Sequence, residues 1–237
     1  MPTTTPTAAV TPEPVLLVHG IWMTGLELLP LSRTLKHEGF APRLFHYPSL
    51  RCSPAENADR LHHWIRRLSP ERLHLVGHSL GGIVLVHLFA RHGDIPPGRA
   101  VLLGTPLQGS RIARRVHRWP ILRILLGRST SQGLLGDLPP WRGGRPVGMI
   151  AGVKGFGIGS MLGGLPRPHD GTVALDETRA DWLTDHQEVP RSHFGMLLDS
   201  QVHRQVARFL EQGRFDHREN RDGRGYTMPR SEQEHSR

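Results

Sequence analysis

The sequence predicts an α/β fold, with a mainly parallel central sheet and helices on both faces. Short apolar runs, such as those at residues 15–19 and 100–103, alternate along the chain with longer amphipathic stretches. These runs are continuous rather than interrupted by polar residues, which is typical of strands buried on both faces. Strands separated by helices favour a parallel sheet, because parallel neighbours need long crossover connections.

Individual elements carry their own start and stop signals. Ser53 and Pro54 begin a helix at 54–68, because serine caps helix ends and proline fits the first helical turn. Gly39 ends a helix at 26–37. Further helices are expected at 81–92 and 195–210. Strands are expected at 15–19, 41–47, 73–76, 100–103, 147–151 and, as a short last strand, 187–189.

The pattern predicts one domain, at residues 14–212, between two disordered ends. Residues 1–13 are rich in threonine and proline, and residues 213–237 are charged and poor in large apolar side chains. An insertion at 107–145, between the fourth and fifth strands, is too long for a simple crossover and is expected to form a helical cap. The glycine-rich stretch 152–169 is expected to be a mobile loop.

Composition limits the classes of function. The net charge is +9, and all but two of the 30 basic residues are arginines. No nucleic-acid-binding motif accompanies this charge, so nucleic acid is not an expected partner. No apolar stretch approaches 18 residues, no secretory signal begins the chain, and Cys52 is the single cysteine. Together these features predict a cytoplasmic protein.

The insertion contains a basic amphipathic segment. Ile112, Val116 and Trp119 recur at helical spacing beside several arginines, and Pro120 is expected to end this helix before a second short apolar one. The segment has two interpretations. It is either a cap helix packed over a pocket with its arginines in water, or a lid that touches lipid while its arginines contact an anionic membrane surface.

The candidate nucleophile is Ser79. Gly77, His78, Ser79, Leu80 and Gly81 form a G-x-S-x-G sequence directly after a predicted strand and directly before a predicted helix. A serine at such a joint is exposed above the sheet in a strained backbone conformation. Side chains at positions 77 and 81 would collide with the neighbouring strand and helix, which explains the two supporting glycines.

A serine hydroxyl needs a base, and the base needs an orienting carboxylate. Asp170 follows the fifth strand and its glycine-rich loop, and His193 follows the last strand, so both are expected at the same sheet edge as Ser79. Other acids and histidines compete for these roles, namely Asp176, Asp181, Asp185, His186 and His203. We favour Asp170 and His193, partly because His203 falls within a predicted helix and is expected at the surface.

An oxyanion formed in acyl transfer must meet backbone N–H donors that are already in place. The first buried strand ends in His19 and Gly20, and Gly20 permits a tight approach of the backbone. The amides of Ile21 and Leu80 are the expected donors. His19 and His78 flank the site, and we expect them to serve in packing or hydrogen bonding.

Five segments, spread over about 180 residues, resemble the α/β-hydrolase superfamily and within it bacterial lipases and esterases. They are H-G-I-W (19–22), G-H-S-L-G-G (77–82), G-T-P-L-Q-G-S (104–110), D-G-T-V (170–173) and H-F-G-M-L (193–197). The resemblance implies Ser79 as nucleophile, Asp170 as acid, His193 as base, and Ile21 and Leu80 as oxyanion donors. The chain departs from the superfamily at its front, where the first two strands are absent.

The resemblance implies cleavage of a carboxylic ester through an acyl-enzyme without a cofactor. The apolar part of the insertion favours a lipophilic acyl group. Thioesterase, amidase and acyltransferase chemistry would use the same triad, and a non-catalytic binding protein of this fold stays an alternative. The sixteen histidines include no H-E-x-x-H pair, so no catalytic metal is expected.

Overall fold

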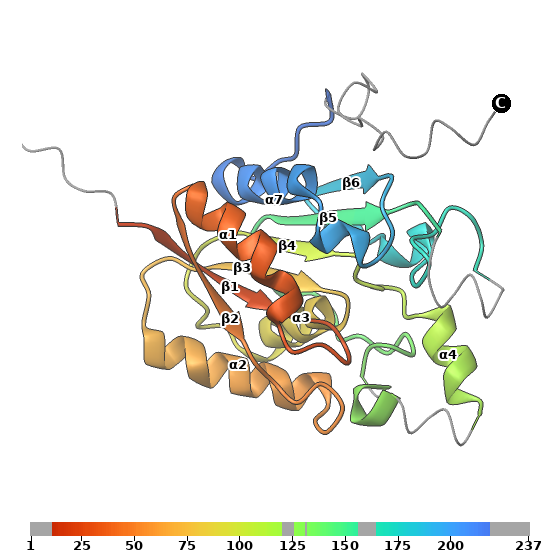
Figure 1. Ribbon diagram of the computed structural model, residues 1–237. Helices are drawn as coiled ribbons and strands as arrows, with labels where there is room; N and C mark the ends of the chain where they lie inside the picture. Colours follow the sequence, from red (N-terminus) through yellow and green to blue (C-terminus); the bar gives the residue numbers. More distant parts are fainter. Residues whose placement is uncertain (1–10, 120–125, 131, 156–164, 219–237) are drawn as a thin grey trace, which may run out of the picture.

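The structure is a computed structural model that describes residues 11–119, 126–130, 132–155 and 165–218 (Figure 1). A six-stranded sheet runs through the centre in the order β2-β1-β3-β4-β5-β6, and every neighbouring pair is parallel. The strands are β1 (Glu13–Val18), β2 (Phe40–Phe45), β3 (His74–His78), β4 (Ala100–Leu103), β5 (Val147–Gly152) and β6 (Asp185–Val189). The predicted α/β class with a mainly parallel sheet is therefore confirmed, and within the described residues no strand precedes β1.

Helices cover both faces of the sheet. The α-helices are α1 (Leu29–His37), α2 (Pro54–Leu68), α3 (Leu80–Arg91), α4 (Arg111–His117) and α7 (Ser200–Gln212), and the 3-10 turns are η1 (Leu26–Leu28), η2 (Gly127–Thr130), η3 (Leu175–Thr178) and η4 (Gly195–Leu197). In Figure 1, α1 and α7 lie above the sheet, and α2 and α3 lie below it. The insertion's α4 lies beyond the carboxyl ends of the strands, at the right of the same view.

Two apolar cores result, one on each face. On β1, Leu16 and Val18 belong to the core between the sheet and helices α2 and α3, whereas Val15 and Leu17 belong to the core between the sheet and helices α1 and α7. Because side chains alternate across a strand, a strand covered on both sides must be apolar at every position. The uninterrupted apolar run seen in the sequence is the consequence.

The helix starts depend on local side-chain bonds. At α2, Ser53 Oγ accepts the amide of Glu56 at 3.2 Å and the Glu56 carboxylate accepts the Ser53 amide at 2.7 Å, which is a capping box. The single helix expected at 195–210 is wrong, because η4 ends and α7 begins afresh at Ser200. The Asp199 carboxylate accepts the amides of Gln201 and Val202 and so starts α7 there.

The strand order places a reversal point between β1 and β3. From β1 the chain moves outward to β2, then crosses back to β3 on the other side of β1 and continues outward to β6. In open parallel sheets, ligands bind beyond the carboxyl ends of the strands at such a reversal. His19 follows β1 and Ser79 follows β3, so the residues at the reversal are those that the sequence singled out.

The segment after α7 corrects one expectation. Residues 213–237 were expected to be a disordered tail, yet Phe215 is buried, with its ring centroid 4.8 Å from that of Phe209. The Phe215 amide donates to Asp185 at 2.7 Å, which ties the segment to β6. Residues 219–237 and most of the predicted N-terminal segment lie outside the described residues. So do residues 120–125, where the second insertion helix was expected, and residues 156–164, which are half of the glycine-rich stretch.

None of the helices in the described part of the chain is long and apolar enough to span a bilayer.

Replacing Phe215 with alanine tests the packing of this segment. We expect the free energy of unfolding to fall by about 3 kcal/mol, because a buried aromatic side chain is removed next to Phe209. Urea denaturation measures this change. The matched control is Leu198→Ala, at a side chain that is 71% exposed, which should change stability by less than about 0.5 kcal/mol. Equal stabilities for the two variants would contradict the packing of Phe215.

Candidate active site

Ser79 sits on a strained turn between β3 and α3. Its backbone has φ 53° and ψ −118°, a region that residues other than glycine rarely adopt. A Cβ on Gly81 would lie 2.2 Å from the carbonyl oxygen of Val18, and a Cβ on Gly77 would lie 2.7 Å from the backbone nitrogen of Gly82. Both glycines are therefore required by close backbone contacts, as the sequence analysis expected. The Ser79 amide donates to the Leu103 carbonyl at 2.9 Å, which fixes the turn to β4.

His193 and Asp170 form a buried hydrogen-bonded pair. The His193 Nδ1 and Asp170 Oδ2 atoms are 2.6 Å apart, and both residues are at most 3% exposed. The other carboxylate oxygen, Oδ1, accepts the amides of Thr172 at 2.9 Å and Val173 at 2.7 Å. These bonds hold the carboxylate in position and favour its ionised form. Since that carboxylate can only accept, His193 carries its proton on Nδ1, which leaves Nε2 with a free lone pair.

His193 lies beside the Ser79 turn. Gly104 follows Leu103, the residue that binds the Ser79 amide, and a Cβ on Gly104 would lie 2.9 Å from His193 Nδ1. Gly104 has φ 56°, so glycine is favoured there by both conformation and space. The ring centroid of His193 is also 4.7 Å from that of His78, the residue before Ser79. The structure thus joins His193 to Asp170 and places His193 beside the turn that carries Ser79.

His78 braces the backbone of His193. Its Nε2 lies 3.3 Å from the His193 carbonyl oxygen, and burial lowers the pKa of His78 well below its usual value. The ring is therefore neutral, and because a carbonyl can only accept, Nε2 is the protonated nitrogen. His78 Nδ1 is buried without a hydrogen-bond partner among the described residues. This geometry fits the expected hydrogen-bonding part of His78.

The loop after β1 approaches Ser79 through Gly20. A Cβ on Gly20 would lie 3.3 Å from Ser79 Cβ and 3.1 Å from His78 Nδ1, so a larger residue would push the loop away. Ile21 follows directly, and Leu80 begins α3. The Ser79 side chain does not cap α3, and the first amides of a helix have no acceptor within the helix. Both expected oxyanion donors therefore lie on backbone that flanks Ser79.

Tyr47 holds this loop in place, and sequence reasoning missed it. Its hydroxyl donates to the His19 carbonyl at 2.6 Å, and its ring stacks on the His19 ring with centroids 4.2 Å apart. Burial raises the pKa of Tyr47 far above its usual value, so the hydroxyl stays a neutral donor. Burial also lowers the pKa of His19, which favours the neutral stacked ring. An aromatic residue just after the second strand gives no motif that could have pointed to this role.

Four of the five competing acids and histidines have other partners, and the fifth, Asp181, is exposed. Asp176 forms a two-pronged ion pair with Arg111, and Asp185 binds the Phe215 amide. Thr178 Oγ1 lies 2.9 Å from His186, whose pKa burial lowers to about 4. His203 was expected at the surface, which is wrong. It is buried with Nε2 2.8 Å from the Leu197 carbonyl, because α7 turns this face toward η4.

A separate group of ligating side chains lies far from Ser79. His62, His92 and Asp94 place ligand atoms within 4.8 Å of one another, and His62 binds Asp94 directly at 2.7 Å. His92 follows the last residue of α3, whereas Ser79 precedes its first residue. A 12-residue helix spans about 18 Å, so this group is not part of the Ser79 site.

The comparisons with known proteins agree on the fold. The family described as "Alpha/beta hydrolase family" matches residues 15–227. No curated protein matches the sequence significantly. Among solved structures, the mature lipase BlEst2 of Bacillus licheniformis is similar with a TM-score of 0.64 at 18% identity, over 89% of this chain and 96% of the lipase.

Two further structures have the same fold. A monoacylglycerol lipase of Paleococcus ferrophilus is similar with a TM-score of 0.58 at 18% identity, over 86% of this chain and 96% of that one. The naproxen esterase of Bacillus subtilis is similar with a TM-score of 0.53 at 15% identity, over 85% of this chain and 84% of that one. With its parallel sheet, its strained serine turn and a match over most of its length, the chain belongs to the alpha/beta hydrolase family.

Proposed function

We propose that the protein is a serine hydrolase that cleaves carboxylic esters, with lipophilic acyl groups, through an acyl-enzyme intermediate. The observation that carries this proposal is the buried 2.6 Å contact between His193 Nδ1 and Asp170 Oδ2, next to a serine held in a strained turn. A buried pair of this kind leaves the opposite imidazole nitrogen as a base. The esterase and lipase activities named for the similar structures agree with it.

In the proposed reaction, Ser79 Oγ attacks the ester carbonyl while its proton moves to His193 Nε2. Asp170 holds the imidazole and stabilises its cationic form, and the amides of Ile21 and Leu80 bind the oxyanion. The tetrahedral intermediate collapses as His193 gives the proton to the departing alkoxide oxygen. Water then attacks the acyl-enzyme with His193 again as base, which releases the acid and restores Ser79. His193 carries each transferred proton, and no cofactor takes part.

Large exposed apolar side chains support a lipophilic substrate. Trp22 is 52% exposed and directly follows Ile21, while Phe194 is 55% exposed and directly follows His193. Leu26, Leu198 and Trp119 are also exposed, the last of these just after α4. Exposed aromatic side chains directly beside the proposed site residues, here Trp22 and Phe194, mark a surface that meets apolar ligands or membranes. Arg115 and Arg118 are exposed on or next to α4, which adds attraction to anionic lipid.

The first test replaces Ser79 with alanine. We expect kcat/KM for a p-nitrophenyl ester to fall by about three orders of magnitude or more, because the attacking oxygen is lost. Thermal unfolding should show no loss of stability, since alanine removes only the hydroxyl. Labelling by a fluorophosphonate probe should also disappear. Full turnover or full labelling of this variant would refute the proposed reaction.

The second test replaces Asp170 with asparagine. The Asn oxygen can still accept the amides of Thr172 and Val173, so its NH₂ group would face His193 Nδ1. His193 would then adopt the other tautomer and lose its base at Nε2. We expect kcat to fall by about two orders of magnitude or more, with a KM within about threefold. A variant with normal kcat would remove Asp170 from the mechanism.

A third test addresses contact with anionic membranes. We expect the protein to sediment with vesicles of phosphatidylglycerol and phosphatidylcholine, and less with phosphatidylcholine alone. The variant Arg115→Glu/Arg118→Glu should bind the anionic vesicles at least about tenfold more weakly at low salt. Its control, Arg66→Glu/Arg67→Glu, makes the same charge change at exposed positions of α2 and should bind within about threefold of the unaltered protein. Equal losses for the two variants would mean that net charge alone, and not the insertion, binds the membrane.

A further inference from the structure

A buried carboxylate outside the triad, Glu177, joins the loop that carries Asp170 to the start of the insertion. Glu177 is 2% exposed and lies in η3, seven residues after Asp170. Its Oε2 accepts the amide of Ala174 at 2.9 Å, within the loop that carries Asp170. Its Oε1 accepts the amide of Arg111 at 2.6 Å, at the first residue of α4. One carboxylate therefore binds two segments that are more than 60 residues apart.

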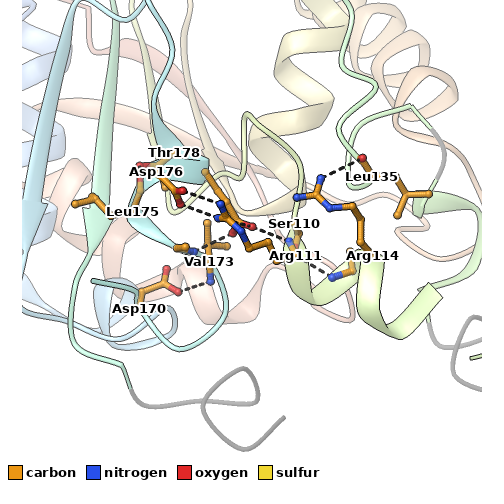
Figure 2. Close-up of polar contacts among 12 residues, drawn as sticks. Ser110, Arg111, Arg114, Leu135, Asp170, Val173, Leu175, Asp176 and Thr178 are labelled. Carbon is orange, nitrogen blue, oxygen red and sulfur yellow. Dashed lines mark hydrogen bonds and ion pairs between the residues drawn. The ribbon is translucent and has the colours of Figure 1, made fainter. Parts of the chain in front are cut away.

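Other bonds run beside this one. The Gln108 amide donates to the Glu177 carbonyl at 3.0 Å, and the Gln108 side chain donates to the Arg179 carbonyl at 2.8 Å. The Arg111 guanidinium donates to both oxygens of Asp176, at 2.8 and 2.7 Å. Figure 2 shows Arg111 and Asp176 paired beside the loop that carries Asp170 and Val173. The contact between residues 108–111 and 174–179 is thus a continuous polar seam.

Within this seam, Glu177 is the buried part and the Arg111–Asp176 pair is the exposed part. Asp176 is 59% exposed at its side chain and Arg111 39%, so water competes for their ion pair. A buried carboxylate with two backbone donors is different, because removing an acceptor leaves buried amides without a partner. Burial raises the pKa of Glu177, and the two amides and the Arg111 guanidinium oppose that effect.

We propose that Glu177 is a positioning residue for Asp170 that also fixes α4 of the insertion to the same loop. This inference rests on the proposed function, since it assigns Glu177 an effect on catalysis through Asp170. The Asp170 loop is closed by its own bonds to Thr172 and Val173, and its far end, at Ala174, is fixed by Glu177. Loss of that anchor would let the Asp170 carboxylate move from His193 and free the first turn of α4 at the same time.

The test variant is Glu177→Gln. Both oxygens of Glu177 accept backbone amides, whereas glutamine has one acceptor and one donor group. Whichever way the amide turns, its NH₂ group faces another N–H, and one of the two bonds is lost. We expect kcat for a p-nitrophenyl ester to fall by about tenfold or more. The matched control is Asp176→Asn, which weakens only the exposed pair with the same arginine and should stay within about twofold of the unaltered protein.

A double-mutant cycle separates positioning from general destabilisation. If Glu177 acts through Asp170, it has little left to position once Asp170 is asparagine. The variant Asp170→Asn/Glu177→Gln should then have a kcat/KM within about threefold of Asp170→Asn alone. Losses that multiply, or a Glu177→Gln variant with turnover within twofold of the unaltered protein, would overturn the proposal.

Amide hydrogen exchange tests the link without any variant. In the unaltered protein, the Ala174 and Arg111 amides should be protected to a similar degree, because one carboxylate accepts both and they open together. A protected Ala174 amide beside a freely exchanging Arg111 amide would overturn the coupling, even if Glu177→Gln did not fold. Failure of the proposed reaction can also be distinguished from failure of the positioning role of Glu177. Full turnover by Ser79→Ala refutes the proposed reaction, whereas loss of turnover there with normal turnover by Glu177→Gln refutes only this inference.

Discussion

The site depends on how closely the first turn of α3 approaches the end of β1. Position 81 has no room for a Cβ, because it would lie 2.2 Å from the Val18 carbonyl oxygen and 2.6 Å from that of His19. The chain must therefore turn sharply between β3 and α3, and the strain falls on Ser79 at φ 53°. Such a conformation costs about 1–3 kcal/mol and persists only where its surroundings enforce it. The same approach sets the loop after β1 against Ser79, so one packing constraint places both the serine and the backbone that flanks it.

Much of this arrangement could be predicted from the sequence because it depends on local rules. The helix at 54–68 and the strand at 100–103 match the structure at both ends, since capping residues and an uninterrupted apolar run mark their limits. The G-x-S-x-G turn is equally local, because a side chain at either glycine position would clash with nearby backbone atoms. Asp170 and His193 could be expected at the edge that holds Ser79 because each lies in the connection after a strand of a parallel sheet, Asp170 after a long glycine-rich stretch and His193 shortly after β6. The structure adds the 2.6 Å contact between them, which no sequence pattern contains.

The misses have a common physical cause, which is that the decisive partner lies outside the helix or segment from which each residue was judged. His203 was assigned to the surface from its helix alone, yet its burial depends on η4 packing against α7. Phe215 lies in a charged stretch that reads as a tail, yet Phe209 and Asp185 hold it. Composition averages over neighbours along the chain. It therefore misses a single aromatic side chain that is buried against a neighbouring element.

Parallel topology also explains why buried polar side chains gather at the edge of the sheet that holds Ser79. Each group of the proposed triad comes from a different loop, and loops that follow separate strands share few local contacts. Backbone bonds within a loop cannot fix one loop relative to another. Side chains that cross between loops do so here: Tyr47 reaches the His19 carbonyl, His78 reaches the His193 carbonyl, and Glu177 reaches the Arg111 amide. Tyr47, His78 and Glu177 bind backbone atoms here, and every residue type has those atoms. A side chain that binds a backbone atom can have almost any residue type as its partner. These residues therefore form no motif with their partners, and they stay hidden until the fold brings them together.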